Sequence, residues 1–196
     1  MNLIEKIEAD VLCEGNCKLK AGQYFIWDSK NDKGGKVEIS DTENDLGCVI
    51  LHNPNGIEVV FMGFKDNALK VDTESGQVKQ CECVLFPATL NDTDWVLFVE
   101  TKYTRSLQLA LDVGIDYPNT MISQILSTVS YFRDKNILPI DKRVHAIVAF
   151  PKLLEDFSEA FFLRSKLTRE QILREFQVLL RATNEATIVS GKRIKI

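Results

Sequence analysis

The stretch that decides the fold runs from Gln80 to Tyr103 and reads QCECVLFPATLNDTDWVLFVETKY. Its first part, Cys81–Phe86, is short and apolar except for Glu82, and Trp95–Val99 is a run of bulky strand-forming residues. Between them, residues 87–94 combine proline, threonine, asparagine and aspartate, which is typical of a turn. The pattern predicts two strands joined as a hairpin.

The second strand ends in charged residues, and charges this close to a core cost free energy unless a partner compensates them. Side chains alternate along a strand, so Glu100 and Lys102 project from one face and Thr101 from the other. If the hairpin turns about Asn91, Glu82 lies opposite Glu100 on that same face, whereas a slip of one residue would move Glu82 to the other face. The expected result is two carboxylates and one ammonium group at one place.

Such a group suits a hard divalent cation. Mg²⁺, with Mn²⁺ as a substitute, prefers oxygen ligands. Glu82 and Glu100 are therefore the candidate metal ligands, and Lys102 would orient a water molecule or stabilise charge on a phosphate. Asp92 and Asp94, in the turn, are the alternative carboxylates.

Length and composition fit a single globular domain spanning residues 1–196. The 196 residues are 45% hydrophobic and 27% charged, which is ordinary for such a domain. No apolar run approaches the roughly 20 residues of a membrane span. The first residues, MNLIEKIEADV, carry charges where a signal peptide needs an apolar segment, so a cytoplasmic location is expected.

The cysteines and histidines give little support for a metal or redox site. An odd number of cysteines without an export signal predicts free thiols; they stand at positions 13, 17, 48, 81 and 83. Cys13 and Cys17 lack a second pair at zinc-ligand spacing. The two histidines, His52 and His145, are far apart in sequence, and His145 is interpreted as a structural residue of a strand.

Charge is distributed unevenly along a chain whose net charge is −4. Residues 1–98 hold nine lysines, no arginine and 17 acidic residues, whereas residues 99–196 hold 15 basic and 11 acidic ones. Arginine is the usual residue for two-pronged phosphate contacts, so Arg105, Arg133 and Arg143 are candidates for binding a nucleic-acid backbone. Helices that carry arginine on solvated faces explain the same pattern equally well.

The first half of the chain predicts a helix over residues 2–12 and then an antiparallel meander. Strong turn signals separate the candidate strands. The strands are Tyr24–Trp27, Lys36–Ile39, Cys48–Leu51, Ile57–Phe64 and Ala68–Val71, and the turns are residues 31–35, 53–56 and 75–76.

The second half is richer in helix. Tyr103–Asp116 fits either a strand or a helical turn, and residues 153–163 fit a helix or an irregular segment. A helix follows from Pro118 to about Arg133, with Gln124, Thr128 and Tyr131 on a polar face. The remaining expected elements are a strand at Arg143–Phe150 parallel to the Glu100 strand, a helix capped by Thr168 that includes Leu179 and Leu180, and a basic strand pair at Ala186–Ile196 with Lys192, Arg193 and Lys195.

This order of elements resembles the core of the PD-(D/E)XK nuclease superfamily. The resembling part is residues 78–151 together with the helix over residues 2–12. The resemblance implies an α/β (α+β) fold with a restriction-endonuclease-like core, in which helices flank a mixed central sheet. In this chain an extended N-terminal antiparallel meander would precede that core.

The resemblance also implies roles for individual residues. In the family, an acid on the second core strand and the acid of the E-x-K strand bind Mg²⁺, the lysine assists the attacking water, and a polar helix residue, often Gln, supports the site. Glu82, Glu100, Lys102 and Gln124 match these positions. Glu8 or Glu5 would supply the additional acid that some members carry on the first helix.

One feature departs from the family pattern. The family usually has Asp where Glu82 stands, and the extra methylene would place a metal further from the strand. Asp94 fits a D-x₅-E-x-K spacing but lies at the distal end of the hairpin. A second acid-x-Lys motif, Asp28-Ser29-Lys30, runs into a hairpin turn and has no helix after it.

The function expected from the resemblance is metal-dependent hydrolysis of DNA phosphodiester bonds, with a homodimer as a possible assembly because two sites are needed to cut two strands. The first alternative is a non-catalytic partner-binding protein on the same fold, whose site would have Lys102 paired directly with Glu100 and buried. The second is a module that binds a small molecule or peptide in a pocket lined by Trp27.

Overall fold

The computed structural model describes residues 2–29, 36–45, 47–70, 79–89 and 94–196. This part of the chain is a mixed α/β structure with two mixed sheets and five helices. The helices are α1 (Leu3–Asp10), α2 (Leu107–Ala110), α3 (Tyr117–Asp134), α4 (Ser158–Arg164) and α5 (Arg169–Phe176). Among the described residues, no helix has both the length and the hydrophobicity required to cross a bilayer.

The larger sheet has six strands in the order β1-β5-β6-β7-β8-β9. Neighbours are antiparallel from β1 to β7, and β7, β8 and β9 are parallel. The strands are β1 (Val11–Leu19), β5 (Val59–Leu69), β6 (Cys83–Pro87), β7 (Leu97–Thr101), β8 (Val144–Ala149) and β9 (Val178–Ala182).

The smaller sheet has five strands in the order β11-β10-β4-β2-β3, and its only parallel pair among the described residues is β4 with β10. The strands are β2 (Gly22–Asp28), β3 (Val37–Ser40), β4 (Val49–Asn53), β10 (Glu185–Ser190) and β11 (Arg193–Lys195). The C-terminal hairpin thus extends a sheet that the N-terminal third of the chain begins.

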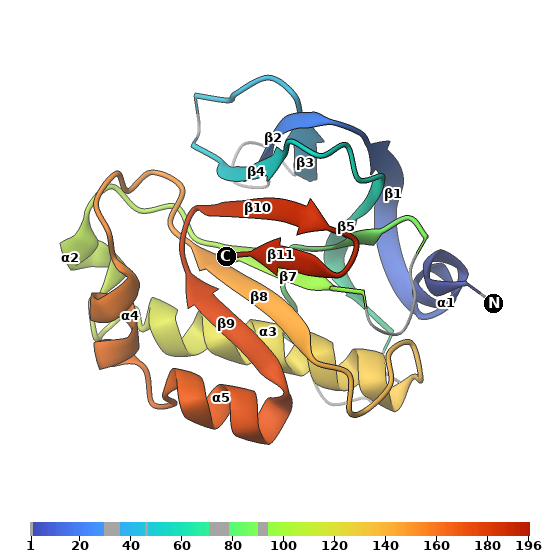
Figure 1. Cartoon of the computed structure of the whole chain (residues 1–196). Coiled ribbons are helices and arrows are strands. Elements are labelled where there is room, and N and C mark those ends of the chain that lie inside the picture. Colours follow the sequence, from blue (N-terminus) through green and yellow to red (C-terminus); the bar gives the residue numbers. More distant parts are fainter. Residues whose placement is uncertain (1, 30–35, 46, 71–78, 90–93) are drawn as a thin grey trace.

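The structure has three layers, with helices on one face of the larger sheet and the smaller sheet on the other (Figure 1). Alternate side chains of each central strand contribute to two separate cores. On β7, Phe98 packs in the helix-side core, whereas Leu97 and Val99 pack in the core between the sheets. This alternation explains why β6 and β7 are buried on both faces.

Helix α3 forms the crossover between β7 and β8 and carries the apolar stripe that covers the sheet. Pro118 lies in its first turn, where the missing N–H leaves no bond unmade. Ile125, Val129 and Phe132 are buried against the larger sheet, and the ring of Phe132 meets Phe98 edge-on with centroids 5.2 Å apart. The predicted helix and the predicted parallel strand pair are both confirmed.

The predicted single meander in the first half is wrong. Strands β2, β3 and β4 form the smaller sheet, while β5 joins the larger one together with β1, which the sequence analysis missed. Strand β5 (Val59–Leu69) runs through the described parts of both expected segments, Ile57–Phe64 and Ala68–Val71, and contains Asn67, a residue with positive φ. The expected turns at residues 31–35 and 75–76 lie outside the described residues.

The long helix expected after Thr168 is also wrong in its extent. Thr168 and Gln171 form the expected capping box, but α5 ends at Phe176, because Gln177 adopts a left-handed conformation. Leu179 and Leu180 lie in β9. The sequence left the structure of two segments undecided. Tyr103–Asp116 contains the short helix α2, and residues 153–163 include the first part of α4.

The fully buried Asn53 ties the end of β4 to two other segments. Its amide group donates to Lys20 O and Ile57 O at 2.6 and 2.7 Å, and its Oδ1 accepts from Ile57 N at 3.1 Å. We expect Asn53→Ala to lower the free energy of unfolding by about 3 kcal/mol, because it leaves buried backbone groups unpaired. Urea denaturation measures this change, and the exposed Asn55→Ala is the control, with an expected loss below about 1 kcal/mol.

Candidate functional site

The pairing of β6 with β7 places the candidate residues. Cys83 is opposite Val99 and Leu85 is opposite Leu97, and the Glu82 amide donates to Val99 O at 3.0 Å. This bond is one residue out of the regular register, so Glu82 and Cys83 both lie beside Val99 and the register does not continue to a Glu82–Glu100 pair. The antiparallel pairing expected for the two strands is confirmed from Cys83 to Leu85, whereas Glu82 opposite Glu100 stays a prediction, and Asn91 at the expected centre of the hairpin lies outside the described residues.

Glu82 lies just before β6, at a bend in the chain. In a regular strand Cys81 and Cys83 would share a face, but Cys81 packs in the helix-side core and Cys83 in the core between the sheets. The chain therefore changes direction at Glu82, so the strand is two residues shorter at its start than the sequence predicted. Glu82 is 7% exposed and sits at the end of the sheet.

Glu100 and Lys102 form a close ion pair at the end of β7. Glu100 is fully buried, and its Oε1 accepts from Lys102 Nζ at 2.5 Å. The Lys102 side chain keeps 24% of its surface exposed. A buried carboxylate is thus neutralised by an ammonium group that still reaches solvent, which is how this strand tolerates a charge next to Phe98.

Lys102 lies within a field of negative charge. Burial alone would lower the pKa of its ammonium group, but the Glu100 carboxylate, and further Glu82 and Asp28, raise that pKa above its ordinary value. Burial likewise raises the pKa of the Cys81 thiol, and the charges of Glu100 and Glu82 add to the effect. Both carboxylates therefore act on the same small region around Lys102 and Cys81.

Side chains on the polar face of α3 form hydrogen bonds with the backbone segment that leads into this region. Gln124 Nε2 donates to Gln80 O at 2.8 Å, and Thr128 Oγ1 accepts from Cys81 N at 2.9 Å. One helical turn further on, Tyr131 Oη donates to Asp10 O at 2.8 Å. The polar face predicted from the sequence thus contacts backbone groups, and Gln124 reaches the segment before Glu82 rather than a carboxylate.

Asp28 and Tyr103 belong to the same region, and the sequence analysis did not assign them to it. Tyr103 Oη accepts from the backbone N–H of Asp28 at 2.9 Å, and burial raises the pKa of its phenol. Asp28 is buried at the end of β2. Its acid-x-Lys motif was noted, but nothing in the sequence signals that the smaller sheet brings it to Lys102. Lys30, the end of that motif, lies outside the described residues.

The other carboxylates considered do not join the site. Glu5 caps its own helix through Asn2 at 2.9 Å, and Glu8 accepts from Asn16 at 2.8 Å. Asp94 begins the segment that leads into β7, six residues before Glu100, so the two are about 20 Å apart along an extended chain. Asp94 as a ligand partner of Glu100 is therefore excluded. Asp92 lies outside the described residues.

The candidate arginines also lie apart from the carboxylates. Arg133 donates to Phe176 O at 2.8 Å and to Lys142 O at 3.0 Å, so it joins α3 to α5 and the start of β8 rather than offering its guanidinium to a phosphate. Arg143 precedes β8 at the opposite end of the sheet from Glu100. Arg105 is exposed three residues after Lys102 and remains a candidate.

The expectations for the cysteines and for Trp27 can be compared with the structure. All five cysteines are free thiols, as predicted. Trp27 is buried with Phe25 and Cys48 in a small cluster, so its ring supports the smaller sheet.

The donor atoms in this region suit a hard cation that is only partly enclosed by protein. Within the described ranges, no three His, Cys, Asp or Glu residues form a group that could hold a metal ion. Mg²⁺ commonly uses one or two carboxylates and completes its shell with water and substrate phosphate, so Glu82 and Glu100 are the residues that would hold it in this region. Gln124 Oε1 adds a buried oxygen without a hydrogen-bond partner among the described residues.

Comparisons with known proteins add no assignment. The chain matches no protein-family model, no curated protein and no solved structure.

The Glu100–Lys102 pair makes a prediction about stability. Lys102→Met leaves Glu100 buried without its ammonium partner and should lower the free energy of unfolding by about 3 kcal/mol at neutral pH. The double variant Glu100→Gln with Lys102→Met should recover most of this loss. Urea denaturation of both variants is the measurement, and equal losses in the two would contradict a buried ion pair.

The Glu100–Lys102 pair also predicts that the free energy of unfolding depends on pH. Because the folded-state pKa of Lys102 is raised above 10.5, the stabilisation by the pair is fully present below that pH and is lost as pH rises through the folded-state pKa. The stability difference between wild type and Lys102→Met should therefore stay constant from pH 7 to about 10 and shrink above it.

Proposed function

We propose that this chain is a metal-dependent nuclease that hydrolyses phosphodiester bonds of DNA at the end of β6 and β7. The observation that supports the proposal is the contact of Lys102 with the buried Glu100 at the end of β7, in a region where the charge of Glu82 also acts on Lys102 and Cys81. Packing of the hydrophobic core does not require two carboxylates and a lysine at this end of the sheet. The chemistry of these three groups suits phosphoryl transfer.

The order and pairing of the elements support membership of the PD-(D/E)XK superfamily. An antiparallel run β5-β6-β7 is followed by helix α3 and by β8 parallel to β7, and α1 precedes them. In such a core, Glu82 before the middle strand and the E-x-K of the third strand would take the positions that the family uses. This topology supports a restriction-endonuclease-like core within the larger sheet.

Each residue has a definable task in the proposed reaction. Glu82 and Glu100 would hold Mg²⁺, which when bound polarises the phosphate and lowers the pKa of a water ligand. Lys102, with its ammonium group partly exposed, would orient the attacking water or stabilise charge on the phosphate. Gln124 acts as a positioning residue, because its amide group fixes Gln80 O two residues before Glu82.

The choice of DNA and of a homodimer follows from the same resemblance. Most members of the superfamily cut DNA, and two copies of one site are needed to cut two strands. Arg105, exposed three residues beyond Lys102, is the arginine best placed to contact a phosphate next to the site.

A specific observation favours a second candidate, a non-catalytic partner-binding protein on the same fold. Lys102 is paired directly with Glu100, and that carboxylate is fully buried. Metal binding through Oε1 of Glu100 would therefore require Lys102 to move away from that oxygen. The partial exposure of Lys102 leaves that movement open, and this is why the nuclease is ranked first.

Metal binding separates the two candidates. Calorimetric titration with Mn²⁺ should show one class of site in wild type, and Glu100→Ala and Glu82→Ala should each weaken it by at least about 100-fold, more than the loss of an outer-shell partner costs. The exposed Glu58→Ala is the matched control and should bind as wild type does. Binding that survives in Glu82→Ala would contradict the shared carboxylate site.

The catalytic role needs its own measurement. Wild type should cleave supercoiled and linear DNA in Mg²⁺, and Lys102→Ala should lose at least about 100-fold in rate while it still binds Mn²⁺. Wild type that binds Mn²⁺ and cleaves neither DNA nor RNA would support the non-catalytic candidate.

A further inference from the structure

The smaller sheet leaves part of the larger sheet uncovered on the face opposite the helices. Ile147 and Ala149 of β8 are buried in the core between the sheets, but His145 on that face is only partly buried. On β9, Leu179 and Arg181 share this face and are partly exposed, whereas Val178 and Leu180 point into the helix-side core. The uncovered area therefore lies over the start of β8 and the whole of β9.

The cations on this area come from two adjacent strands. His145 is opposite Leu179 and Ile147 is opposite Arg181, so Arg143, His145 and Arg181 project from the same face. Burial and then the charges of Arg143 and Arg181 lower the pKa of His145, so its imidazole is neutral near pH 7 while the guanidinium groups on either side stay charged. His145 Nδ1 is buried and has no hydrogen-bond partner in the described part of the chain.

The β10–β11 hairpin adds further cations beside this area. Trp95 Nε1 donates to Ser190 O at 2.9 Å, which fixes the hairpin turn at the beginning of β7. In the parallel register of β7 and β8, Trp95 is level with Arg143. Lys192 and Arg193 follow the turn directly and are exposed, so they stand at the same end of the sheet as Arg143.

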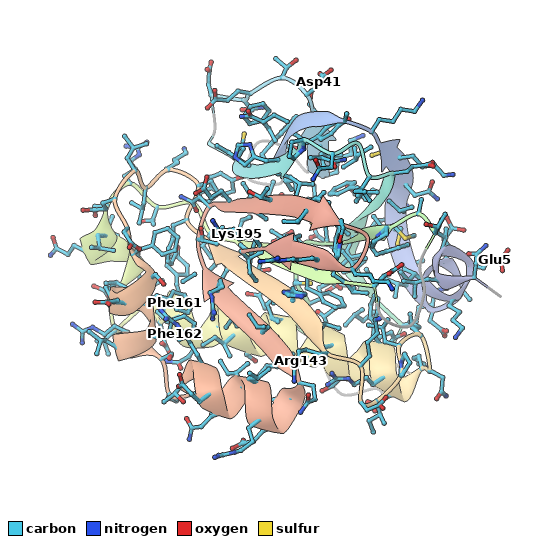
Figure 2. The ribbon with its side chains drawn as sticks, viewed as in Figure 1. Glu5, Asp41, Arg143, Phe161, Phe162 and Lys195 are labelled. Atoms are coloured by element: carbon cyan, nitrogen blue, oxygen red, sulfur yellow. The ribbon has the colours of Figure 1, made fainter. Side chains whose placement is uncertain are left out.

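Strand β11 presents its charges to solvent. Ile194 is buried in the core between the sheets, so Arg193 and Lys195 point away from that core and are exposed. Figure 2 shows Lys195 on the hairpin and Arg143 near the start of β8 below it. We call Arg143, Arg181, Lys192, Arg193 and Lys195 together the basic face.

The acids near these charges are unevenly placed. Asp141 is exposed just before Arg143, and Glu170, exposed on α5, interacts with Arg181. Arg181 also lines a hollow with Glu155, Asp156 and Glu185, and the buried Asp94 lies beside Gly191 in the hairpin turn. The cations therefore exceed the exposed acids mainly around Arg143, Lys192 and Arg193. Such a local excess of Arg and Lys favours a polyanion.

We propose that the basic face binds the phosphate backbone of nucleic acid, separately from the carboxylate site. The choice of nucleic acid as the polyanion rests on the proposed function. Paired arginines on neighbouring strands suit two-pronged contact with phosphate, and a row of cations along two sheet edges follows a polymer rather than a small anion.

The basic face lies at a different end of the larger sheet from the carboxylate site, and on the opposite side of that sheet. Glu100 is opposite Val148 on β8, and Val148 is five residues from Arg143. Five residues of extended strand place Glu100 about 17 Å from Arg143 along the sheet. Glu100 also belongs to the helix side of the sheet, like Phe98, whereas Arg143 and Arg181 lie on the opposite side. A nucleic acid held here would be anchored by a segment other than the one at Glu100.

Protection of sheet edges is the competing explanation, because β9 and β11 are both edge strands and charged residues there prevent association with other sheets. That role is served by either sign of charge, whereas the basic face is built mainly of cations. Edge protection also predicts that the protein has no affinity for DNA.

The test is fluorescence anisotropy with a short labelled DNA duplex in EDTA, over a range of KCl concentrations. Wild type should bind, and Arg143→Glu with Arg181→Glu should weaken binding at least about tenfold and reduce the slope of log K against log [salt] by about 2. Lys192→Glu with Arg193→Glu, two exposed hairpin residues, should do the same and serves if the first variant does not fold. Lys20→Glu with Lys65→Glu makes the same charge change at exposed positions near the opposite edge of the larger sheet and should bind as wild type does.

Three results would overturn the proposal: no binding by wild type at low salt, an equal loss in the Lys20 and Lys65 control, or equally tight binding of poly-glutamate, which would indicate an acidic protein partner. Glu100→Gln in the same assay separates this proposal from the proposed function. Because the assay contains no free metal, failure of the carboxylate site leaves the expected binding unchanged.

Discussion

The buried Glu100 carboxylate and its Lys102 partner are the constraint on which the centre of this structure depends. A strand as apolar as β7 would end more simply in another hydrophobic residue, and a buried ion pair rarely stabilises a fold more than well-packed apolar side chains would. Here the pair sits at the end of the sheet, where Lys102 still reaches solvent and Glu82 and Asp28 add negative charge. The region has one cation among several carboxylates, so binding a second cation there would improve its charge balance.

Helix α3 explains why these charges are held so close to the sheet. Its apolar stripe covers the central strands, while Gln124 and Thr128 bond to the backbone at Gln80 and Cys81. The bend at Glu82 is thus fixed from the helix side, and the pairing of Glu82 N with Val99 O fixes it from the sheet side. Packing and carboxylate placement depend on the same helix, so a disturbance of α3 would affect both.

Local patterns predicted the elements that lie close together in sequence. The apolar runs of β6 and β7 with turn residues between them were sufficient to predict the antiparallel pair, and the stripe of α3 predicted the crossover. The misses arise from long-range contacts: β1 lacks a strong strand pattern and is stabilised by pairing with β5, and β9 is apolar enough to continue the α5 pattern until Gln177 interrupts it. Asp28 and Tyr103 meet across 75 residues, and no local signal encodes that contact.

The two faces of the larger sheet divide the chemistry of the molecule. Glu100 and Lys102 lie at one end of β7 on the helix side, and the opposite side carries the arginines of the basic face on β8 and β9. The acidic region and the basic face are therefore separated along the sheet and by its two sides.

The most direct test of the central claim is a crystal structure of the protein soaked in Mn²⁺, with anomalous scattering used to locate the metal. We expect an anomalous peak between the Glu82 and Glu100 carboxylates, with Lys102 Nζ moved away from Glu100 Oε1. Crystals that show no peak there and keep the Glu100–Lys102 ion pair intact would contradict a metal site at this position.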